Sequence, residues 1–275
     1  MECLMARALK YIILSSLLTI SRPLSGQIWE LQDSLEFDHA IRIIKSDPRK
    51  NIYLNDVQGN VLKLDSIGNL IASFAPQQYG QITTMEPWPA LRLFLYYENT
   101  QSYTFLDRYL SGEQFTVFPP SIGFASMAAA SSDNQIWIID DRAFSLLKYD
   151  FSFNQISLNS SFNQLPEKLD LDPYQMKEYQ NRLYVGDHNY GVLVFDNLGN
   201  YIKSIPLPAP LRFNFVGDEL YYLHGGAIHY IDLYHNDSRE LMLPGYHSYS
   251  QALILGRTAI LASGNMIYIY HYSPR

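Results

Sequence analysis

The sequence has one cysteine among its 275 residues, Cys3, and this residue lies in an N-terminal segment that we expect to be removed. A mature chain without cysteine has no disulfide bond, no thiolate nucleophile and no cysteine-ligated metal. Its stability must therefore come from packing and hydrogen bonding alone.

Charged residues are also scarce, because Lys, Arg, Asp and Glu together make up 17% of the chain. The longest basic run is Arg49-Lys50, the formal net charge is −7 and the pI is near 5.4. Nucleic acids and anionic membrane surfaces both require a basic patch, so neither is expected as a partner.

Helical patterns and familiar catalytic motifs are missing as well. Beyond the N-terminal segment, no stretch of ten or more residues has the apolar spacing of an amphipathic helix. The sequence contains no Gly-x-Ser-x-Gly elbow, no His-Glu-x-x-His motif and no phosphate-binding loop. It therefore does not support a serine hydrolase, a zincin or a nucleotide-dependent enzyme.

Residues 1–26 have the layout of a signal peptide. Arg7 and Lys10 precede the apolar run Tyr11–Ile20, and small residues precede a cleavage point ahead of Gln27. The alternative is a membrane anchor, but ten apolar residues are too few to cross about 30 Å of hydrocarbon. Translation could also begin at Met5 rather than Met1. Cleavage removes three basic residues and one acidic residue, a net +2, and changes the charge from −7 to −9. We expect an exported protein of the periplasm, the cell envelope or the extracellular space, with no stable membrane span in the mature chain.

A repeat of about forty residues organises the rest of the chain. Its clearest copy is Leu183–Ile205, where three short runs of apolar, β-branched and aromatic residues alternate with turns rich in Asp, Asn and Gly. The second strand of each copy is centred on Tyr53, Phe94, Trp137, Tyr184, Tyr221 or Ile260, with spacings of 41, 43, 47, 37 and 39 residues. The longest spacing contains residues 165–179, which we expect to form a loop because of Pro166 and Pro173.

Units of this length with four short strands are typical of β-propeller blades. The regular spacing favours a propeller over the alternative, a β-sandwich. The last unit is one strand short, and an unused strand candidate, Ile28–Asp33, follows the leader. We therefore predict an all-β, six-bladed propeller in which this N-terminal strand completes the last blade and removes the open sheet edge. His39–Lys45 becomes the innermost strand of the first blade, and residues 27–275 form a single domain.

The fourth unit resembles an NHL-type repeat. Members of that family pair a strand of the form (I/V)YV-x-D with V-x-V-F-D-x-x-G, as Tyr184–Asp187 and Val192–Gly199 do here. The first unit matches nearly as well, whereas the fifth and sixth keep little beyond the period. The chain is thus similar to exported six-bladed propellers of bacteria. This resemblance implies the fold and, by analogy, a role in interactions.

Candidate site residues lie in the loops that join the second and third strands of successive blades. These loops lie at one mouth of the central channel and could hold a hydrogen-bonding ligand or a hard cation. Tight turns also favour Asp and Asn, which is the alternative explanation for them. The candidates are Asp56, Glu98, Asp140, Asp187, His188 and His224.

The function that we predict is non-catalytic binding of a protein, peptide or glycan in the cell envelope, by a monomer without a cofactor. A structural module of a larger envelope assembly would use the same chemistry. The alternative is a metal-dependent hydrolase that resembles lactonase-like propellers and uses the carboxylate rim. In that case a divalent cation such as calcium would be bound, and His188 or His224 could act as an acid or base.

Overall fold

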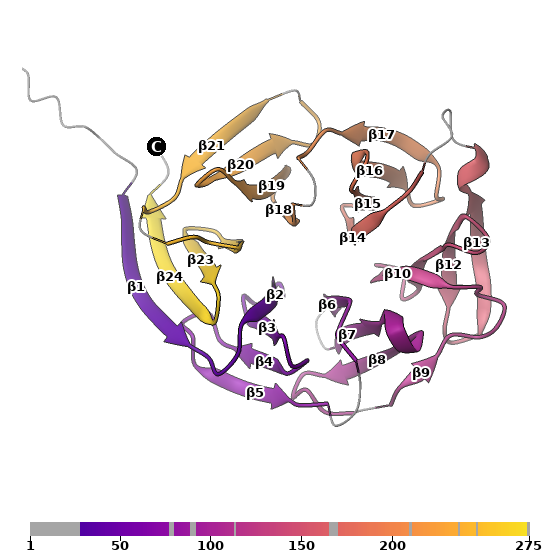
Figure 1. Cartoon of the computed structure of the whole chain (residues 1–275), viewed down its shortest axis with the longest axis horizontal. Coiled ribbons are helices and arrows are strands. Elements are labelled where there is room, and N and C mark those ends of the chain that lie inside the picture. The colour runs from indigo at the N-terminus through magenta and orange to yellow at the C-terminus, as the bar shows by residue number, and fades with distance from the viewer. Residues whose placement is uncertain are drawn as a thin grey trace, which may run out of the picture.

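The computed structural model describes residues 28–76, 80–88, 92–112, 114–164, 170–208, 211–235, 237–245 and 247–273. These residues form six four-stranded antiparallel sheets arranged in a ring around a central axis (Figure 1). The six-bladed propeller predicted from the repeat is confirmed. The predicted signal peptide, residues 1–26, lies outside the described residues.

Each blade has a strand at the channel and three strands outside it. The first three blades are β2–β5 (Ile41–Ser46, Ile52–Asp56, Val61–Leu64, Leu70–Phe74), β6–β9 (Thr84–Trp88, Arg92–Tyr97, Ser102–Asp107, Thr116–Val117) and β10–β13 (Ala125–Ala130, Ile136–Asp140, Ser145–Asp150, Gln155–Ser161). The fourth and fifth are β14–β17 (Pro173–Tyr179, Arg182–Asp187, Gly191–Asp196, Tyr201–Ile205) and β18–β21 (Phe213–Val216, Glu219–His224, Ala227–Asp232, Ser238–Met242). The sixth consists of β22–β24 (Gln251–Leu255, Thr258–Ser263, Met266–Ser273) and β1 (Ile28–Glu36).

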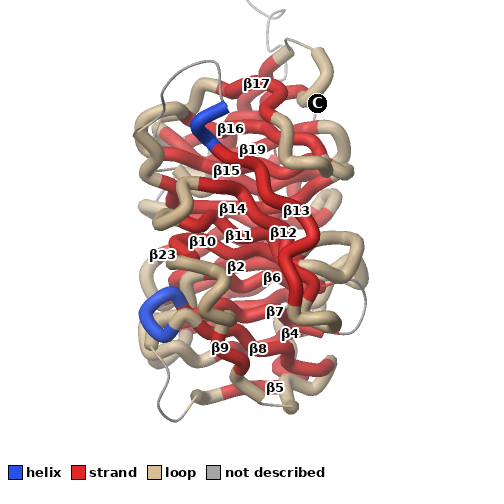
Figure 2. The backbone as a smooth tube through the Cα atoms, turned by 90° about the vertical axis from the view of Figure 1, so that its right-hand side faces the viewer, coloured by secondary structure: helices blue, strands red, loops and turns tan. Residues whose placement is uncertain are grey.

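The turns gather on the two faces of the ring, as the edge-on view in Figure 2 shows. Two short 3-10 helices, η1 (Glu98–Thr100) and η2 (Phe162–Gln164), lie on the same side. Among the described helices, none is long and apolar enough to cross a membrane.

An Asp at the end of the third strand, or directly after it, fixes the next turn in five blades. Each carboxylate accepts a hydrogen bond from the backbone N–H two residues further on, which closes a tight turn. The five residues are Asp65, Asp107, Asp150, Asp196 and Asp232.

The apolar core lies between blades rather than at one centre. For example, Phe94 and Tyr96 of β7 pack against Ala128 and Ile138 of the third blade. The same arrangement continues round the ring, and Leu54 packs on Ile260 where the first and sixth blades meet. Six interfaces of this kind make every blade depend on both neighbours for burial of its apolar faces.

Strand β1 closes the ring by pairing with β24 in antiparallel register, from Ile28 opposite Ser273 to Glu36 opposite Met266. The indole Nε1 of Trp29 also donates to the carbonyl of Met242, in the neighbouring blade, over 2.8 Å. The predicted closure by the N-terminal strand is confirmed, and the inner strand of the first blade covers Ile41–Ser46.

The prediction of a loop through residue 179 was wrong, because β14 occupies Pro173–Tyr179. Pro173 is the first residue of this strand, where its missing N–H does not interrupt the sheet. Gln175 and Met176 are buried, so this segment is the inner strand of the fourth blade.

Candidate functional site

All six sequence-predicted residues lie on the face of the ring where the inner strands begin. The strand register pairs Asp56 with Ile41, Asp140 with Ala125 and Asp187 with Pro173, the first residues of three inner strands. Glu98 begins η1, His188 follows β15 and His224 ends β19.

Three of these carboxylates hold turns together. Asp56 accepts hydrogen bonds from the backbone N–H groups of Gln58 and Asn60, both at 2.9 Å, and from Asn60 Nδ2 at 2.7 Å. Asp187 is fully buried and accepts from the N–H groups of Asp172 at 2.7 Å and Asn189 at 2.8 Å. Neither carboxylate is directed to the channel as a free ligand.

Asp140 has the most complete set of donors. Its carboxylate accepts from four backbone N–H groups, those of Gly123, Phe124, Arg142 and Ala143, at 2.8 to 3.2 Å. Burial acts to raise the pKa of Asp140, but the four donors outweigh it and hold the pKa below its usual value. Asp140 is therefore an ionised structural group.

Glu98 differs from the three aspartates. Burial and the nearby carboxylate of Asp141 raise the pKa of Glu98. Asp141 itself accepts a hydrogen bond of 2.5 Å from Ser126 Oγ. Glu98 of the second blade thus faces a like charge of the third blade at the rim.

The two histidines lie in different blades. His188 Nδ1 is 2.9 Å from the carbonyl oxygen of Asp172 and 3.3 Å from its carboxylate, and the ring meets Tyr174 edge-on. His224 is exposed, and its carbonyl oxygen is 3.0 Å from His229 Nε2. Only Asp187 and His188 come together, through their shared partner Asp172.

No three His, Cys, Asp or Glu side chains in the described part of the chain are close enough to hold a metal ion. The rim carboxylates are distributed round the ring and are bound to their own turns. Their arrangement provides no ligand set for the hydrolase alternative. Whether any of the six residues contacts a ligand stays a prediction.

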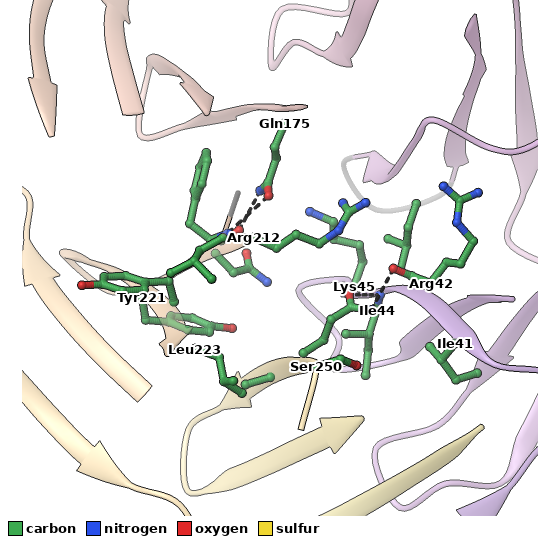
Figure 3. Close-up of a pocket in the computed structure, with 16 residues that line it drawn as sticks. Ile41, Arg42, Ile44, Lys45, Gln175, Arg212, Tyr221, Leu223 and Ser250 are labelled. Atoms are coloured by element: carbon green, nitrogen blue, oxygen red, sulfur yellow. Dashed lines mark hydrogen bonds between the residues drawn. The ribbon is translucent and has the colours of Figure 1, made fainter. Parts of the chain in front are cut away.

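A cavity of about 350 Å³ lies in the channel at this same face. It is formed by inner strands β2, β14, β18 and β22 and by the end of β19, so four blades contribute to it. Figure 3 shows the side chains of Arg42, Lys45 and Arg212 extending into this space. The remaining wall includes Ile41, Leu223, Ser250 and Ala252.

Two glutamine side chains brace the wall. Gln175 Nε2 donates to the carbonyl of Phe213 at 2.7 Å, and its Oε1 accepts from the N–H of Phe213 at 3.2 Å. Gln251 does the same with the carbonyl of Arg42, at 2.7 Å, and the N–H of Ile44, at 3.2 Å. Each amide thus bonds to the neighbouring inner strand as a further strand would, and fixes the wall of the cavity.

The cavity wall is positively charged. Burial and the neighbouring Arg42 lower the pKa of Arg212, although its side chain stays in contact with solvent within the channel. Lys45 Nζ is 3.3 Å from a carboxylate oxygen of Glu86. Deeper in the channel, burial lowers the pKa of Lys177 to about 8, with Glu86 opposing the shift and Lys45 adding to it.

A second cavity, of about 590 Å³, lies at the opposite end of the channel and includes Glu86, Lys177 and Glu178. Asn214 lines both cavities and accepts a 2.9 Å hydrogen bond from Lys177 Nζ. The polar lining therefore continues along the channel.

The sequence-based prediction missed the basic residues of the inner strands. Arg42 interrupts the apolar run Ile41–Ile44 and Lys45 follows it, and Arg212 directly precedes the strand Phe213–Val216. A basic residue within an otherwise apolar first strand of a blade could have indicated these positions. This pattern points to the channel only if the first strand of each blade is known to face it.

No protein-family model matches this sequence, and no curated protein is similar to it. Among solved structures, it is similar to the Pan2 WD40 domain of Neurospora crassa, with 11% identity, a TM-score of 0.60, and coverage of 91% of this chain and 97% of that one. It is also similar to virginiamycin B lyase from Staphylococcus aureus, with 12% identity, a TM-score of 0.57, and coverage of 89% and 99%. A streptogramin B lyase matches with 13% identity, a TM-score of 0.57 and 91% coverage of both chains. At these identities the similarity shows the β-propeller fold alone, and the NHL-type repeat and bacterial origin stay predictions.

Proposed function

We propose that this protein is an exported, non-catalytic β-propeller that binds part of a protein, peptide or glycan in the mouth of its central channel. The observation that carries this proposal is the 350 Å³ cavity where the inner strands of four blades meet. A volume of this size is at the lower end of small-ligand sites, so it would receive a terminal group rather than a folded surface.

The metal-dependent hydrolase is the weaker candidate. It requires several carboxylates or imidazoles to converge, whereas Asp56, Asp140 and Asp187 are hydrogen-bonded within their own turns. The structural neighbours include both a WD40 domain and lyases, so they do not separate a binding role from a catalytic one.

The proposal is tested by blocking the cavity. Ser250 is exposed at its wall, and Ser250→Trp would fill part of the space. Ser204→Trp, on the exposed outer strand β17, is the matched control. Ligands from a glycan array and a peptide library would be measured by calorimetry on the wild type and both variants. We expect at least a tenfold loss of affinity in Ser250→Trp alone, and equal affinity in all three proteins would place the ligand elsewhere.

Export is tested separately by sequencing the N-terminus of the protein recovered from its native cells. A chain that begins at Gln27 supports cleavage of the leader, and one that begins at Met1 or Met5 contradicts it.

A further inference from the structure

The cavity at the channel mouth is lined by basic side chains and by no acidic side chain. Of its sixteen lining residues, Arg42, Lys45 and Arg212 are basic, and none is Asp or Glu. This is unexpected in a chain with a net charge of −7. Neighbouring like charges repel each other, so their presence at one cavity suggests that they bind an anionic group.

The two guanidinium groups lack partners within the described residues. Lys45 is paired with Glu86, but neither the Arg42 nor the Arg212 side chain forms a hydrogen bond or ion pair with any residue that the structure describes. Each guanidinium group has five N–H donors in a planar fork, which matches the oxygens of a carboxylate or phosphate.

Other acidic groups of the channel are already engaged. Asp47 and Glu178 line only the cavity at the opposite end. Asp47 accepts hydrogen bonds from Asn51 and Tyr53, and Glu178 accepts one from Trp137. Among the described residues, no carboxylate forms an ion pair with Arg42 or Arg212.

The backbone that carries both arginines is fixed in advance. The carbonyl of Arg42 accepts the hydrogen bond from Gln251, and Arg212 directly precedes Phe213, whose N–H and carbonyl are both bonded to Gln175. The backbone at both positions therefore loses little conformational freedom when a ligand binds, and the cost of ordering falls on the two side chains. Figure 3 shows the Arg212 side chain extending across the cavity toward the strand that carries Arg42 and Lys45.

We infer that the channel mouth is an oxyanion site, in which Arg42 and Arg212 together hold the carboxylate or phosphate group of an acidic ligand. The inference deepens the proposed function and rests on it, because it specifies which chemical group enters the cavity. Ile41, Leu223 and Ala252 supply an apolar wall for the body that bears the acid.

The inference is tested by calorimetry with inorganic phosphate, D-glucuronate and the neutral D-glucose as probes, at low ionic strength. Wild-type protein should bind phosphate or glucuronate saturably and bind glucose at least about tenfold more weakly. Tighter binding of phosphate identifies a phosphate ligand, and tighter binding of glucuronate identifies a carboxylate; both results support the site.

Arg42→Gln and Arg212→Gln should each weaken anion binding at least about tenfold. Arg257→Gln, in the exposed turn between β22 and β23, makes the same change of charge outside the cavity and should bind as the wild type does. A second readout controls for folding: Arg42→Gln should melt at a higher temperature than the wild type without ligand, because it relieves repulsion. Phosphate should raise the melting temperature of the wild type more than that of Arg42→Gln.

The inference is overturned if neither anion binds, or if both arginine variants bind as tightly as Arg257→Gln. Its failure can be separated from that of the proposed function. A neutral ligand that is lost in Ser250→Trp but kept in Arg42→Gln would retain the channel as a binding site and exclude the oxyanion role.

Discussion

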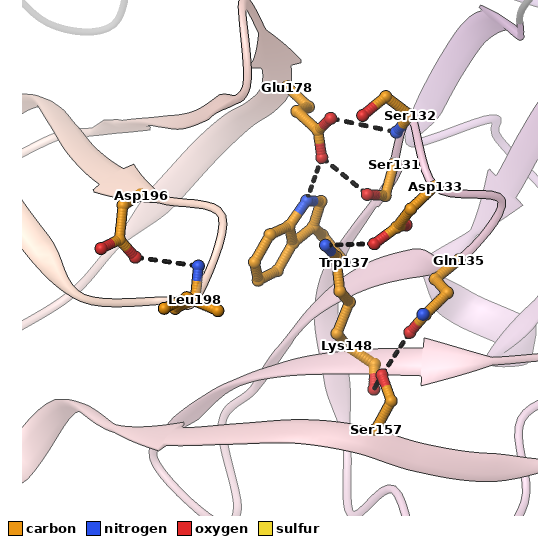
Figure 4. Close-up of polar contacts among 10 residues, drawn as sticks. All are labelled: Ser131, Ser132, Asp133, Gln135, Trp137, Lys148, Ser157, Glu178, Asp196 and Leu198. Carbon is orange, nitrogen blue, oxygen red and sulfur yellow. Dashed lines mark hydrogen bonds and ion pairs between the residues drawn. The ribbon is translucent and has the colours of Figure 1, made fainter.

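Glu178, on the inner strand of the fourth blade, joins that blade to the third. Its Oε2 accepts hydrogen bonds from Trp137 Nε1 at 2.6 Å and Ser131 Oγ at 2.7 Å, and its Oε1 accepts one from the N–H of Ser132 at 3.0 Å (Figure 4). Lys148 packs against the Trp137 ring, with its Nζ 4.4 Å from the ring centroid. One carboxylate thus satisfies three donors of a neighbouring blade.

Glu178→Ala should therefore be costly. Trp137 is fully buried, and its indole N–H would lose a charged hydrogen-bond partner. We expect a loss of about 2 to 3 kcal/mol in the free energy of unfolding, measured by urea denaturation. In a Trp137→Phe background, where this donor is absent, the same substitution should cost at least about 1 kcal/mol less.

Glu30→Ala, on the exposed outer strand β1, is the control and should stay within about 0.5 kcal/mol of the wild type. If Glu178→Ala costs no more than this control, the carboxylate does not join the blades.

Lys177 should make stability depend on pH in a defined window. Its folded pKa of about 8 lies below the ordinary value of 10.5 because the charged form is buried. Between these values the unfolded chain binds more protons than the folded one, so stability rises with pH. The gain should be about 1 to 2 kcal/mol, since water in the channel screens part of the effect.

Lys177→Met removes this titration, and the stability difference between the two proteins should change steadily from pH 8 to pH 10. Buried tyrosines such as Tyr221 have a raised pKa and act in the opposite direction, but only above about pH 10 and equally in both proteins. Parallel stability curves from pH 8 to pH 10 would show that Lys177 has an ordinary pKa.

At the scale of the element, the hairpin of β15 and β16 contains a turn position, Gly191, at which only glycine fits. Gly191 has φ +74°, and a Cβ atom at this position would lie 2.5 Å from the carbonyl oxygen of Ile205 and 2.8 Å from the nitrogen of Leu207. Both neighbours are backbone atoms, one at the end of β17 and one in the connection after it, so neither can rotate away as a side chain could. The residue must be glycine for the fourth blade to close.

Gly191→Ala should lower the free energy of unfolding by about 3 kcal/mol or more, as measured by chemical denaturation. Gly225→Ala is the matched control, because Gly225 also has a positive φ, +58°, but a Cβ there meets nothing within 4 Å. This control should cost only the strain of the left-handed backbone, about 1 kcal/mol. Equal losses in the two variants would show that the contact with Ile205 is not limiting.

The strands could be predicted from the sequence because each depends on local signals. The runs around Tyr53, Trp137 and Tyr184 are apolar, β-branched or aromatic, and Asp196 ends a strand at a turn that it caps itself. β14 was missed because Pro173 argues against a strand, although the strand begins at this proline and pairs with β15 across a turn of two residues.

At the scale of the whole molecule, the site could be predicted only in part. That the loops after the second strands lie together on one face could be predicted, because strand order determines the face. Arg42 and Arg212 are 170 positions apart in sequence and become neighbours only when the ring closes. No local pattern records that proximity, so the sequence favoured the aspartates, which the structure shows to be turn residues.

Ring closure by β1 is the feature on which the whole molecule depends, and it leads to the last prediction. A chain that begins at Phe37 lacks β1, so β24 would become an open edge from Met266 to Ser273 and the contact of Trp29 with Met242 would be lost. We expect a melting temperature at least about 10 °C lower than that of a chain beginning at Gln27, together with concentration-dependent self-association seen by light scattering. A synthetic peptide of residues 28–36 should restore the monomer, because it offers the missing edge strand. If the truncated chain stays monomeric and has the same melting temperature as the longer chain, then five complete blades and a three-stranded sixth blade are sufficient to hold the ring.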